Sequence, residues 1–582
     1  MSRHPRGTML SAILTTVSVC WVSLAGPAPH GSPAPPAIPT TPTTATTAIH
    51  ADLIVENARI FSDSLVGFAS FAAVREGRFV YVGAWREELI GPRTLRVDAG
   101  GRVVIPGLFD SHLHMLSGGL QLSRLKLRDA SGKEDFVARV ARWREKLEPG
   151  TWILGGRWST ESWRVPGQPT KEWVDAVTGD HPLFLSRMDG HSALANSVAL
   201  RTAGITSAGP SDPEGGVIDR DPVTGEPTGI LRESAMGLVS RHIPPATIQE
   251  KARALERAVD LALRHGITAV SDIPSISDLP VYERLARARP SIRFFLYPTA
   301  DDWAQAAQEI RRFRGRPGWV EVMGLKGFVD GSLGSRTAYM NRPYLPAPTS
   351  AVSVRTPGRG LLREGFEDGR FARNVASGRA AGLQTIVHAI GDEANHLLLD
   401  LLAEAYPDLA SARCRSEHAQ HLLPQDIARF GALGVIASMQ PYHKADDGRY
   451  AESYIGPERS RYSYAFKSLL DAGAVVAFGS DWPVVTLNPF LGIEAAVTGR
   501  TLDGSIWQPH QNITVAEAIR CYTSRAAYAV FAEKELGRIA AGYRADFVIL
   551  DRSPFDPAVD FSAIRPAAVY VEGRKVFGAE RR

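Results

Sequence analysis

VVIPGLFDSHLH, residues 103–114, is an apolar, β-rich run that ends in His112 and His114. Because a strand places alternate residues on one face, the two imidazoles are expected to point the same way. Three later runs end in a side chain of the same chemistry: His388 in TIVHAIGD, His418 in SEHAQ and Asp481 in AFGSDWPV. Neutral imidazole and carboxylate oxygen are ligands of zinc and its neighbours. One His-x-His pair arises easily by accident, but four such strand ends together indicate a divalent metal centre.

The middle of the chain alternates short apolar runs with amphipathic segments. Strands are predicted to begin near Val103, Ile267, Arg293, Val322, Leu383, Arg415, Gly434 and Ala474. Residues 250–266, EKARALERAVDLALRHG, show the helical pattern, with an apolar stripe through Leu255, Val259 and Ala262. This α/β alternation predicts a closed (β/α)8 TIM barrel, with a doubly wound open sheet as the alternative. The carboxyl ends of all barrel strands meet on one face, so the metal-binding stretches would converge.

Both ends of this central region carry short alternating strands separated by glycine and asparagine turns. Residues 51–104 and 536–582 are predicted to form one composite β-sandwich domain around a metal-binding barrel of residues 105–535. A long insertion at about residues 117–245 separates the first two barrel strands. Because insertions after a barrel strand usually shape the mouth of the site, this one is expected to wall the pocket and select the substrate.

The first 50 residues predict export. Arg3 and Arg6 precede an apolar run and a Pro/Thr-rich sequel, which is typical of a signal peptide at residues 1–26 and a flexible tether at residues 27–50. The alternative is a retained membrane anchor, although the apolar core is barely long enough to span a bilayer. We therefore expect a periplasmic or extracellular protein with no stable membrane span after processing.

The composition, 44% hydrophobic and 22% charged, is that of a globular protein. Beyond residue 50 the chain holds 64 basic and 62 acidic side chains, which gives no reason to expect a nucleic-acid partner. The expected partner is a small-molecule substrate, and a homo-oligomer stays open. Cys414 and Cys521 are expected to be buried free thiols, with one disulfide between them as the alternative.

Lys326, in GLKGFVDGSLGSRTA, lies on the predicted fourth strand and is directed by register towards the barrel mouth. A protonated lysine beside two divalent cations would be strongly repelled in a site of low dielectric constant. Lysine loses its proton readily in such surroundings, and the neutral amine can add carbon dioxide to form a carbamate. The two carbamate oxygens could bridge two metal ions. The alternative is an ordinary lysine paired with Asp330.

A set of motifs, in order, resembles the amidohydrolase superfamily, in the branch of the YtcJ-like proteins and N-substituted formamide deformylase. The motifs are PGLFDSHLH, HSALANSVAL, KGFVDGSLGSRTA, VHAIGD, EHAQ, GSDWPV and YTSRAAYAVF with LGRIAAGYRADFVILD. The resemblance covers about residues 51–577 and implies a (β/α)8 barrel, a β-sandwich and a binuclear zinc site bridged by a carboxylated lysine. It assigns the metal ligands to His112, His114, Lys326, His388, His418 and Asp481. The one rival ligand is His421.

This ligand set implies a hydrolytic mechanism. Two metals roughly 3.5–4 Å apart can share a hydroxide, because coordination lowers the pKa of water to about 7, and the hydroxide would attack a carbonyl. Asp481 is expected to take its proton and deliver it to the leaving nitrogen. His191 is expected to orient the substrate or stabilise the oxyanion, with a structural hydrogen-bonding role as the alternative. Trp158 and Tyr442 are candidate pocket walls, with plain packing as the alternative.

The predicted function is hydrolysis of a carbon–nitrogen bond in an amide, an N-acyl compound or a formamide. The expected cofactors are two divalent metal ions, zinc foremost, and carbon dioxide held as a carbamate on Lys326. One alternative is hydrolysis of a cyclic amide or an ester by the same site, and another is a non-catalytic exported protein that binds metal or ligand. Asp481 favours an enzyme, because a capture protein needs no proton shuttle beside an open coordination position.

Overall fold

The computed structural model of the chain describes residues 50–62, 67–160, 163, 167–313, 318–346, 358–363 and 365–578. Residues 49–582 form one compact unit. The predicted signal peptide and nearly all of the predicted tether lie outside the described residues, so both stay predictions.

Parallel strands at eight positions form the central barrel. They fall in two ladders, ordered β17-β16-β15-β8 and β18-β19-β20-β21-β22, and every neighbouring pair is parallel. β17 and β18 occupy one strand position, interrupted at Met323, and so join the two ladders. At the other seam, Asp481 N donates a hydrogen bond to His112 O at 2.6 Å. The strand bounds are β8 (Leu108–Leu113), β15 (Ile267–Asp272), β16 (Arg293–Leu296), β17 (Val320–Val322), β18 (Gly324–Phe328), β19 (Gln384–Ala389), β20 (Arg415–His418), β21 (Ile436–Met439) and β22 (Val476–Phe478).

Helical segments lie between successive barrel strands and after the last of them. In α6 the predicted apolar stripe through Leu255, Val259 and Ala262 is fully buried. Thr247 and Glu250 form a capping box at its start, which satisfies two backbone N–H groups that the first turn would otherwise leave free. The helix bounds are α1 (Met115–Gln121), α6 (Ile248–Arg264), α7 (Leu279–Ala288), α8 (Trp303–Glu309), α9 (Arg370–Ala380), α10 (Asp392–Ala405), α12 (Pro424–Leu433), α16 (Phe466–Asp471), α17 (Pro489–Thr498) and α18 (Val515–Cys521).

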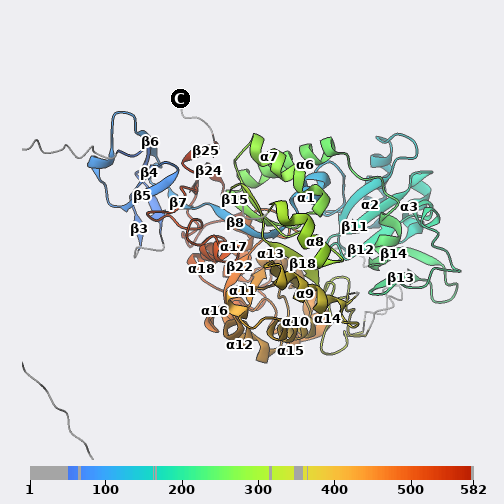
Figure 1. Cartoon of the computed structure of the whole chain (residues 1–582). Helices are drawn as coiled ribbons and strands as arrows, with labels where there is room; N and C mark the ends of the chain where they lie inside the picture. Colours follow the sequence, from blue (N-terminus) through green and yellow to red (C-terminus); the bar gives the residue numbers. More distant parts are fainter. Residues whose placement is uncertain are drawn as a thin grey trace, which may run out of the picture. The chain divides into compact units, whose positions relative to one another are not determined.

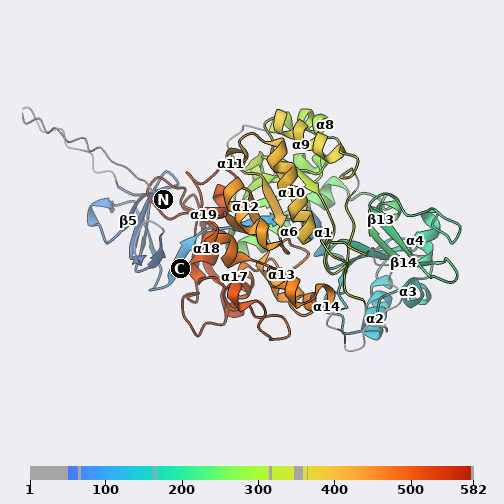
Figure 2. The same cartoon turned by 90° about the horizontal axis from the view of Figure 1, so that it is seen from below.

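Strands from the two ends of the compact unit share one sheet, ordered β25-β24-β23-β7-β2-β3, in which β23 pairs antiparallel with β7. Figures 1 and 2 show these early and late strands, blue and dark red, side by side. A second sheet, ordered β5-β4-β1-β6, packs its apolar side chains into the same cluster. The bounds are β1 (Leu53–Glu56), β2 (Arg59–Phe61), β3 (Phe68–Ala69), β4 (Phe71–Arg75), β5 (Arg78–Gly83), β6 (Leu95–Asp98), β7 (Val103–Pro106), β23 (Phe547–Leu550), β24 (Pro566–Val571) and β25 (Arg574–Phe577).

The run that begins at Val103 serves both parts of the fold, which the sequence did not reveal. β7 belongs to the sheet shared by the chain ends, β8 belongs to the barrel, and Gly107 separates them. A Cβ atom at Gly107 would lie only 2.3 Å from Thr268 Oγ1 on β15, so the close approach of the chain at residue 107 to β15 requires glycine. The first barrel strand therefore starts at Leu108 and not near Val103.

The insertion after β8 is an α/β subdomain with its own hydrophobic clusters. Its sheet is ordered β13-β14-β12-β11-β10-β9, and in Figures 1 and 2 its teal elements lie together beside the barrel. The bounds are β9 (Leu125–Lys126), β10 (Ile153–Trp158), β11 (Leu183–Arg187), β12 (Ser192–Ala195), β13 (Gly216–Arg220), β14 (Pro227–Glu233), α2 (Lys133–Arg144), α3 (Lys171–Thr178), α4 (Ser197–Thr202) and α5 (Met236–Ser240).

The structure also shows the state of the cysteines and the character of the described helices. Cys414 and Cys521 are both free and buried, as expected. Burial raises the pKa of the Cys414 thiol to about 12 and that of Cys521 to about 11. None of the described helices combines the length and the apolar character that crossing a membrane requires.

Candidate metal centre

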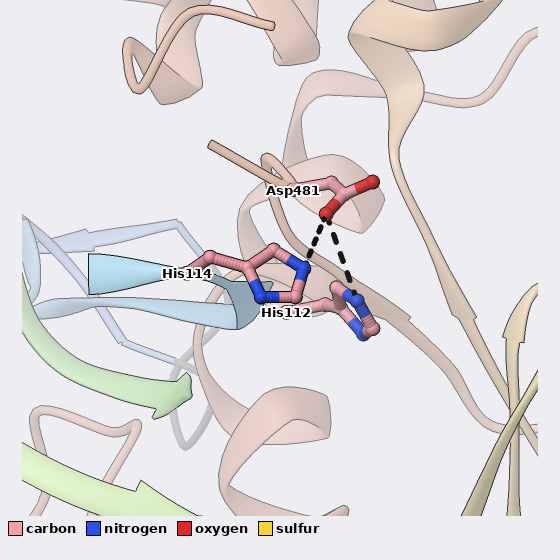
Figure 3. Close-up of side chains that lie close together, drawn as sticks. All are labelled: His112, His114 and Asp481. Carbon is pink, nitrogen blue, oxygen red and sulfur yellow. Dashed lines mark ion pairs between the residues drawn. The ribbon is translucent and has the colours of Figure 1, made fainter. Parts of the chain in front are cut away.

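Side chains from the ends of β8 and β22 converge at the barrel mouth, as Figure 3 shows. Asp481 Oδ1 lies 3.2 Å from His114 Nε2 and 3.7 Å from His112 Nε2. Asp481 is buried, and its Oδ1 accepts no hydrogen bond from any described residue. A buried carboxylate oxygen without a donor is costly unless a cation compensates it. The two imidazole nitrogens and this oxygen therefore fit a divalent metal ion.

A buried ion pair behind His112 orients its ring. His112 Nδ1 contacts Glu417 Oε2, which leaves Nε2 as the ligand nitrogen. Arg415 donates to the same carboxylate from Nε at 2.7 Å and from Nη2 at 3.0 Å, and neither side chain of this pair is exposed. Burial alone would raise the pKa of Glu417, but Arg415 and His112 hold it well below its usual range. An ionised partner of this kind fixes the tautomer of a ligating histidine.

Two more histidines come from neighbouring barrel strands. The ring centroid of His418 lies 4.5 Å from that of His388 and 4.8 Å from that of His112. His388 Nε2 donates to Gly331 O at 2.9 Å, which leaves Nδ1 with a lone pair, whereas His418 Nδ1 bonds Gln440 Oε1 at 2.7 Å, which leaves Nε2. Burial lowers the pKa of both rings well below the usual value. Both are thus neutral, the form that binds metal.

Lys326 is buried on β18 and interacts electrostatically with His112, His388 and His418. Burial lowers its pKa to about 8, although Glu417 and Asp481 act to raise it. Its positive charge also contributes to the lowered pKa values of the histidines on β8, β19 and β20. Among the described residues no carboxylate forms an ion pair with Lys326, and Asp330 instead accepts hydrogen bonds from three backbone N–H groups. The alternative pairing with Asp330 is therefore not found.

Backbone strain marks the same centre. His418 and Asp481 both hold left-handed conformations, with φ of 77° and 56°. Side chains other than glycine adopt this region at a cost, and such residues collect at functional sites. The hydrogen bond from Asp481 N to His112 O, at 2.6 Å, holds one of the two strained ligands against its partner.

A cavity of about 40 Å3 adjoins Asp481 and is lined in part by His443 of α13 (Pro441–Asp447). His443 Nε2 lies 4.0 Å from Asp481 Oδ2 and has no hydrogen-bond partner among the described residues. With His418 and Asp481, His443 forms a second grouping of metal-ligand types. However, the Gln420 amide donates to His443 Nδ1 at 3.1 Å, so Nε2 carries the proton. We therefore interpret His443 as a hydrogen-bond donor facing the cavity and not as a ligand.

His191 reaches the same cavity from the insertion. Its ring centroid lies 4.9 Å from that of His388, and its Nδ1 is 2.9 Å from a carboxylate oxygen of Glu233. The buried Glu233 also accepts from Thr337 Oγ1 and from Arg363 Nη1, each at 2.6 Å. Burial would lower the pKa of His191, but Glu233 raises it overall. The insertion thus supplies a fixed imidazole to the centre.

Residues 96–577 match the model of a family described as the amidohydrolase family. The chain belongs to the amidohydrolase family. This amidohydrolase is 36% identical to LONG AFTER FAR-RED 3 of Arabidopsis thaliana, over 91% of the chain and 92% of that protein. It is 32% identical to YtcJ of Bacillus subtilis, over 81% of the chain and 89% of that protein. It is 27% identical to the N-substituted formamide deformylase of Arthrobacter pascens, over 90% and 97%.

Among solved structures, an uncharacterized metal-dependent hydrolase from Pyrococcus horikoshii superposes with a TM-score of 0.68 at 26% identity. The superposition covers 88% of the amidohydrolase chain and 99% of the other chain. The predicted family and barrel fold are therefore confirmed. So is the predicted enzyme class, a metal-dependent hydrolase of carbon–nitrogen bonds other than peptide bonds.

Three sequence candidates of the amidohydrolase lie apart from the ligand cluster. Trp158 is fully buried in a hydrophobic cluster of the insertion and lines no described cavity, which matches the packing alternative. Tyr442 lies on α13 outside the lining of the cavity at Asp481. His421 Nδ1 bonds Ser463 Oγ at 2.7 Å, and neither His421 nor His388 belongs to the two groupings of close ligand atoms among the described residues.

Sequence reasoning missed the residues that orient the histidines of the site: Glu417 and Gln440, which hold His112 and His418, and Glu233, which holds His191. Glu417 precedes the ligand His418 in EHAQ and lies two residues after Arg415. The period of a strand places that acid and that arginine on one face, which was the available signal. Gln440 and Glu233 lie in other segments and carry no such signal.

Proposed function

We propose that this amidohydrolase hydrolyses a small amide, N-acyl or N-formyl compound at a binuclear metal site. Zinc is the proposed metal, and carbon dioxide is the proposed source of a carboxylated Lys326. The observation that carries the proposal is the convergence of His112, His114 and Asp481 around a buried carboxylate oxygen without a donor. This arrangement fits a cation and is costly without one.

The ligand atoms divide into two sets. His112 Nε2, His114 Nε2 and Asp481 would hold one ion, and His388 Nδ1 with His418 Nε2 would hold the other. A carboxylated Lys326 would supply one oxygen to each set, and its lowered pKa of about 8 makes the neutral, reactive amine accessible near neutral pH. Bound divalent ions polarise a carbonyl group and lower the pKa of water.

Asp481 is the residue proposed to move the proton. Its Oδ1 faces the ligand histidines, while its Oδ2 lies 4.0 Å from His443 Nε2 on the cavity side. A carboxylate in this position can accept a proton from the attacking water and return it to the leaving nitrogen. His191, held through Nδ1 by Glu233, is proposed to donate from Nε2 to the oxyanion that develops on the substrate.

The experiment uses purified protein, stripped with a chelator and reloaded with zinc in the presence of bicarbonate. It is assayed against a panel of N-formyl and N-acyl amines, with cyclic amides and esters included because the same residues could attack them. We expect two metal ions per chain and turnover of at least one amide. A metal-loaded protein that hydrolyses no amide on the panel would overturn the proposal.

Two variants test the assigned roles. Asp481→Asn should keep most of the metal and lose at least ~100-fold in activity, because asparagine offers an oxygen but accepts no proton. Lys326→Ala should bind metal poorly and regain part of its activity with formate or acetate, which can fill the emptied space. Lys467→Ala is the control, since the side chain of Lys467 is 42% exposed and pairs with Asp471. A Lys326→Ala protein with two metals and normal turnover would refute the bridging role.

We also propose that the protein is exported, on the basis of the basic start and apolar run of its first 26 residues. An exported amidohydrolase would meet small amides outside the cytoplasm. Fractionation of cells that make the natural protein tests this, with recovery only in the cytosol as the contrary result.

A further inference from the structure

A second cavity, of about 320 Å3, lies between α1, β10 and residues 482–486 that follow Asp481. Its apolar walls include Leu122, Trp482 and Pro483. Val485 lines both this cavity and the smaller one at Asp481, so the two share a wall. The volume falls within the range of small-molecule sites, roughly 300–1,000 Å3. The cavity can therefore hold the part of a substrate that leads away from the metal centre.

Two half-buried guanidinium groups line this cavity without a carboxylate partner among the described residues. Arg128 Nη1 donates to Val484 O, and Arg157 Nη1 donates to Met188 O at 3.4 Å. The acid on the same wall, Asp129, pairs with Arg139 at 2.6 Å and neutralises neither group. Burial lowers the pKa of Arg157 to about 10, so the group stays protonated. Asp446 acts on Arg128, and Asp481 and Asp189 act on Arg157, but none of these carboxylates lies within ion-pair distance. An anionic ligand in the cavity would pair with the two half-buried guanidinium groups directly.

The backbone at the end of β10 is built to aim Arg157. Gly155, Gly156 and Arg157 have φ of 123°, 97° and 60°, and the register with β11 shifts between Gly156 and Trp158. A Cβ atom at Gly155 would lie 2.4 Å from Leu125 O, so that position requires glycine. Irregularities of this kind redirect a side chain next to binding sites. Here Trp158 turns into the core of the insertion while Arg157 lines the cavity.

We propose that this cavity binds a carboxylate of the substrate, and that the substrate class is amides that carry an acid group on an apolar spacer. Arg128 and Arg157 would bind the carboxylate, since a guanidinium fork matches its two oxygens. Leu122, Trp482 and Pro483 would contact the spacer. The inference rests on the proposed amide hydrolysis only for the identity of the reacting bond.

The first experiment compares matched substrates on the zinc-loaded enzyme, 4-(formamidomethyl)benzoate and its neutral carboxamide counterpart. We expect kcat/KM to be at least ~10-fold higher for the carboxylate, the scale of one charge-assisted hydrogen bond. Arg157→Gln and Arg128→Gln should each lower kcat/KM for the carboxylate far more than for the neutral compound, and so remove most of this preference. Arg201→Gln, at an exposed arginine in the last turn of α4, is the control and should keep the preference. Equal kcat/KM for the two compounds in the wild type would overturn the inference.

The second experiment measures binding without turnover. Titration calorimetry of the zinc-loaded enzyme with 4-(aminomethyl)benzoate and with its carboxamide should show at least ~10-fold tighter binding of the carboxylate, and Arg157→Gln should abolish the difference. Thermal unfolding of each variant checks that it is folded, and Arg128→Gln replaces Arg157→Gln if the latter is not. Equal binding refutes the carboxylate site. An enzyme that binds the carboxylate but hydrolyses no amide refutes the proposed function alone.

Discussion

Glu417→Gln is the substitution that tests most directly how the barrel holds its metal ligands. The change keeps the shape of the side chain and removes its charge. Glu417 is fully buried between His112 Nδ1 and the guanidinium of Arg415, so the change removes the counter-charge of Arg415 and the ionised partner of His112 Nδ1 at once. The carboxamide can also donate to Nδ1, which would favour the tautomer with its proton on Nε2, the ligand nitrogen.

Glu417→Gln should change two quantities, the free energy of unfolding and the affinity for metal. Leaving Arg415 buried and unpaired should lower the free energy of unfolding of the metal-free protein by about 3–5 kcal/mol. Losing the partner that orients His112 should weaken metal binding by roughly 10–100-fold. Glu535→Gln is the matched control, because the side chain of Glu535 is 46% exposed where it pairs with Arg544 and Arg78, and the change should cost less than ~1 kcal/mol.

The assay has two readouts, urea unfolding of the metal-free protein and zinc affinity by competition with a chelator. The double variant Arg415→Met with Glu417→Gln separates them, since it removes the unpaired charge but not the misoriented His112. It should recover stability and keep the weakened metal binding. If Glu417→Gln unfolds at the wild-type urea concentration and holds zinc with wild-type affinity, the orienting role of this ion pair is refuted.

Three further outcomes can be measured on the same protein. Lys444→Met should stabilise the protein most at pH 7 and progressively less towards pH 10. Burial lowers the pKa of Lys444 from 10.5 to about 7, so the folded state binds fewer protons than the unfolded state between these pH values. The wild type therefore gains stability as the pH rises, and the advantage of the variant shrinks. Parallel urea midpoints for the two proteins between pH 7 and 10 would contradict this. Cys414 and Cys521 should stay unreactive towards a thiol reagent at pH 8 until urea is added, because burial raises the pKa of both thiols. Rapid labelling of the native protein would contradict this prediction. Natively made protein should begin beyond about residue 26, and recovery of Met1 by N-terminal sequencing would disprove processing.

The sequence predicted the barrel and its six candidate ligands because each signal is local. A strand followed by a helix is visible in the apolar period, and His112 with His114 share a face by strand geometry alone. The split of the first run at Gly107 was not predictable, since it depends on the approach of Thr268 from another strand. Trp158 illustrates the same limit: an aromatic residue in a β-rich run reads identically whether it faces a pocket or a core. Its true neighbours belong to the fold of the insertion.

The left-handed backbone at Asp481 restricts which residues evolution can place there. Glutamate is as good a metal ligand as aspartate in chemical terms, and Glu233 and Glu572 adopt a similar φ of 49°, but glycine, asparagine and aspartate do so at a lower steric cost. Of these, only aspartate both binds metal and exchanges a proton. The chain geometry and the reaction therefore both favour aspartate at this position, whereas Asn or Gly would satisfy the chain geometry alone. A sequence with either residue here would mark a relative that keeps the barrel and has given up the chemistry.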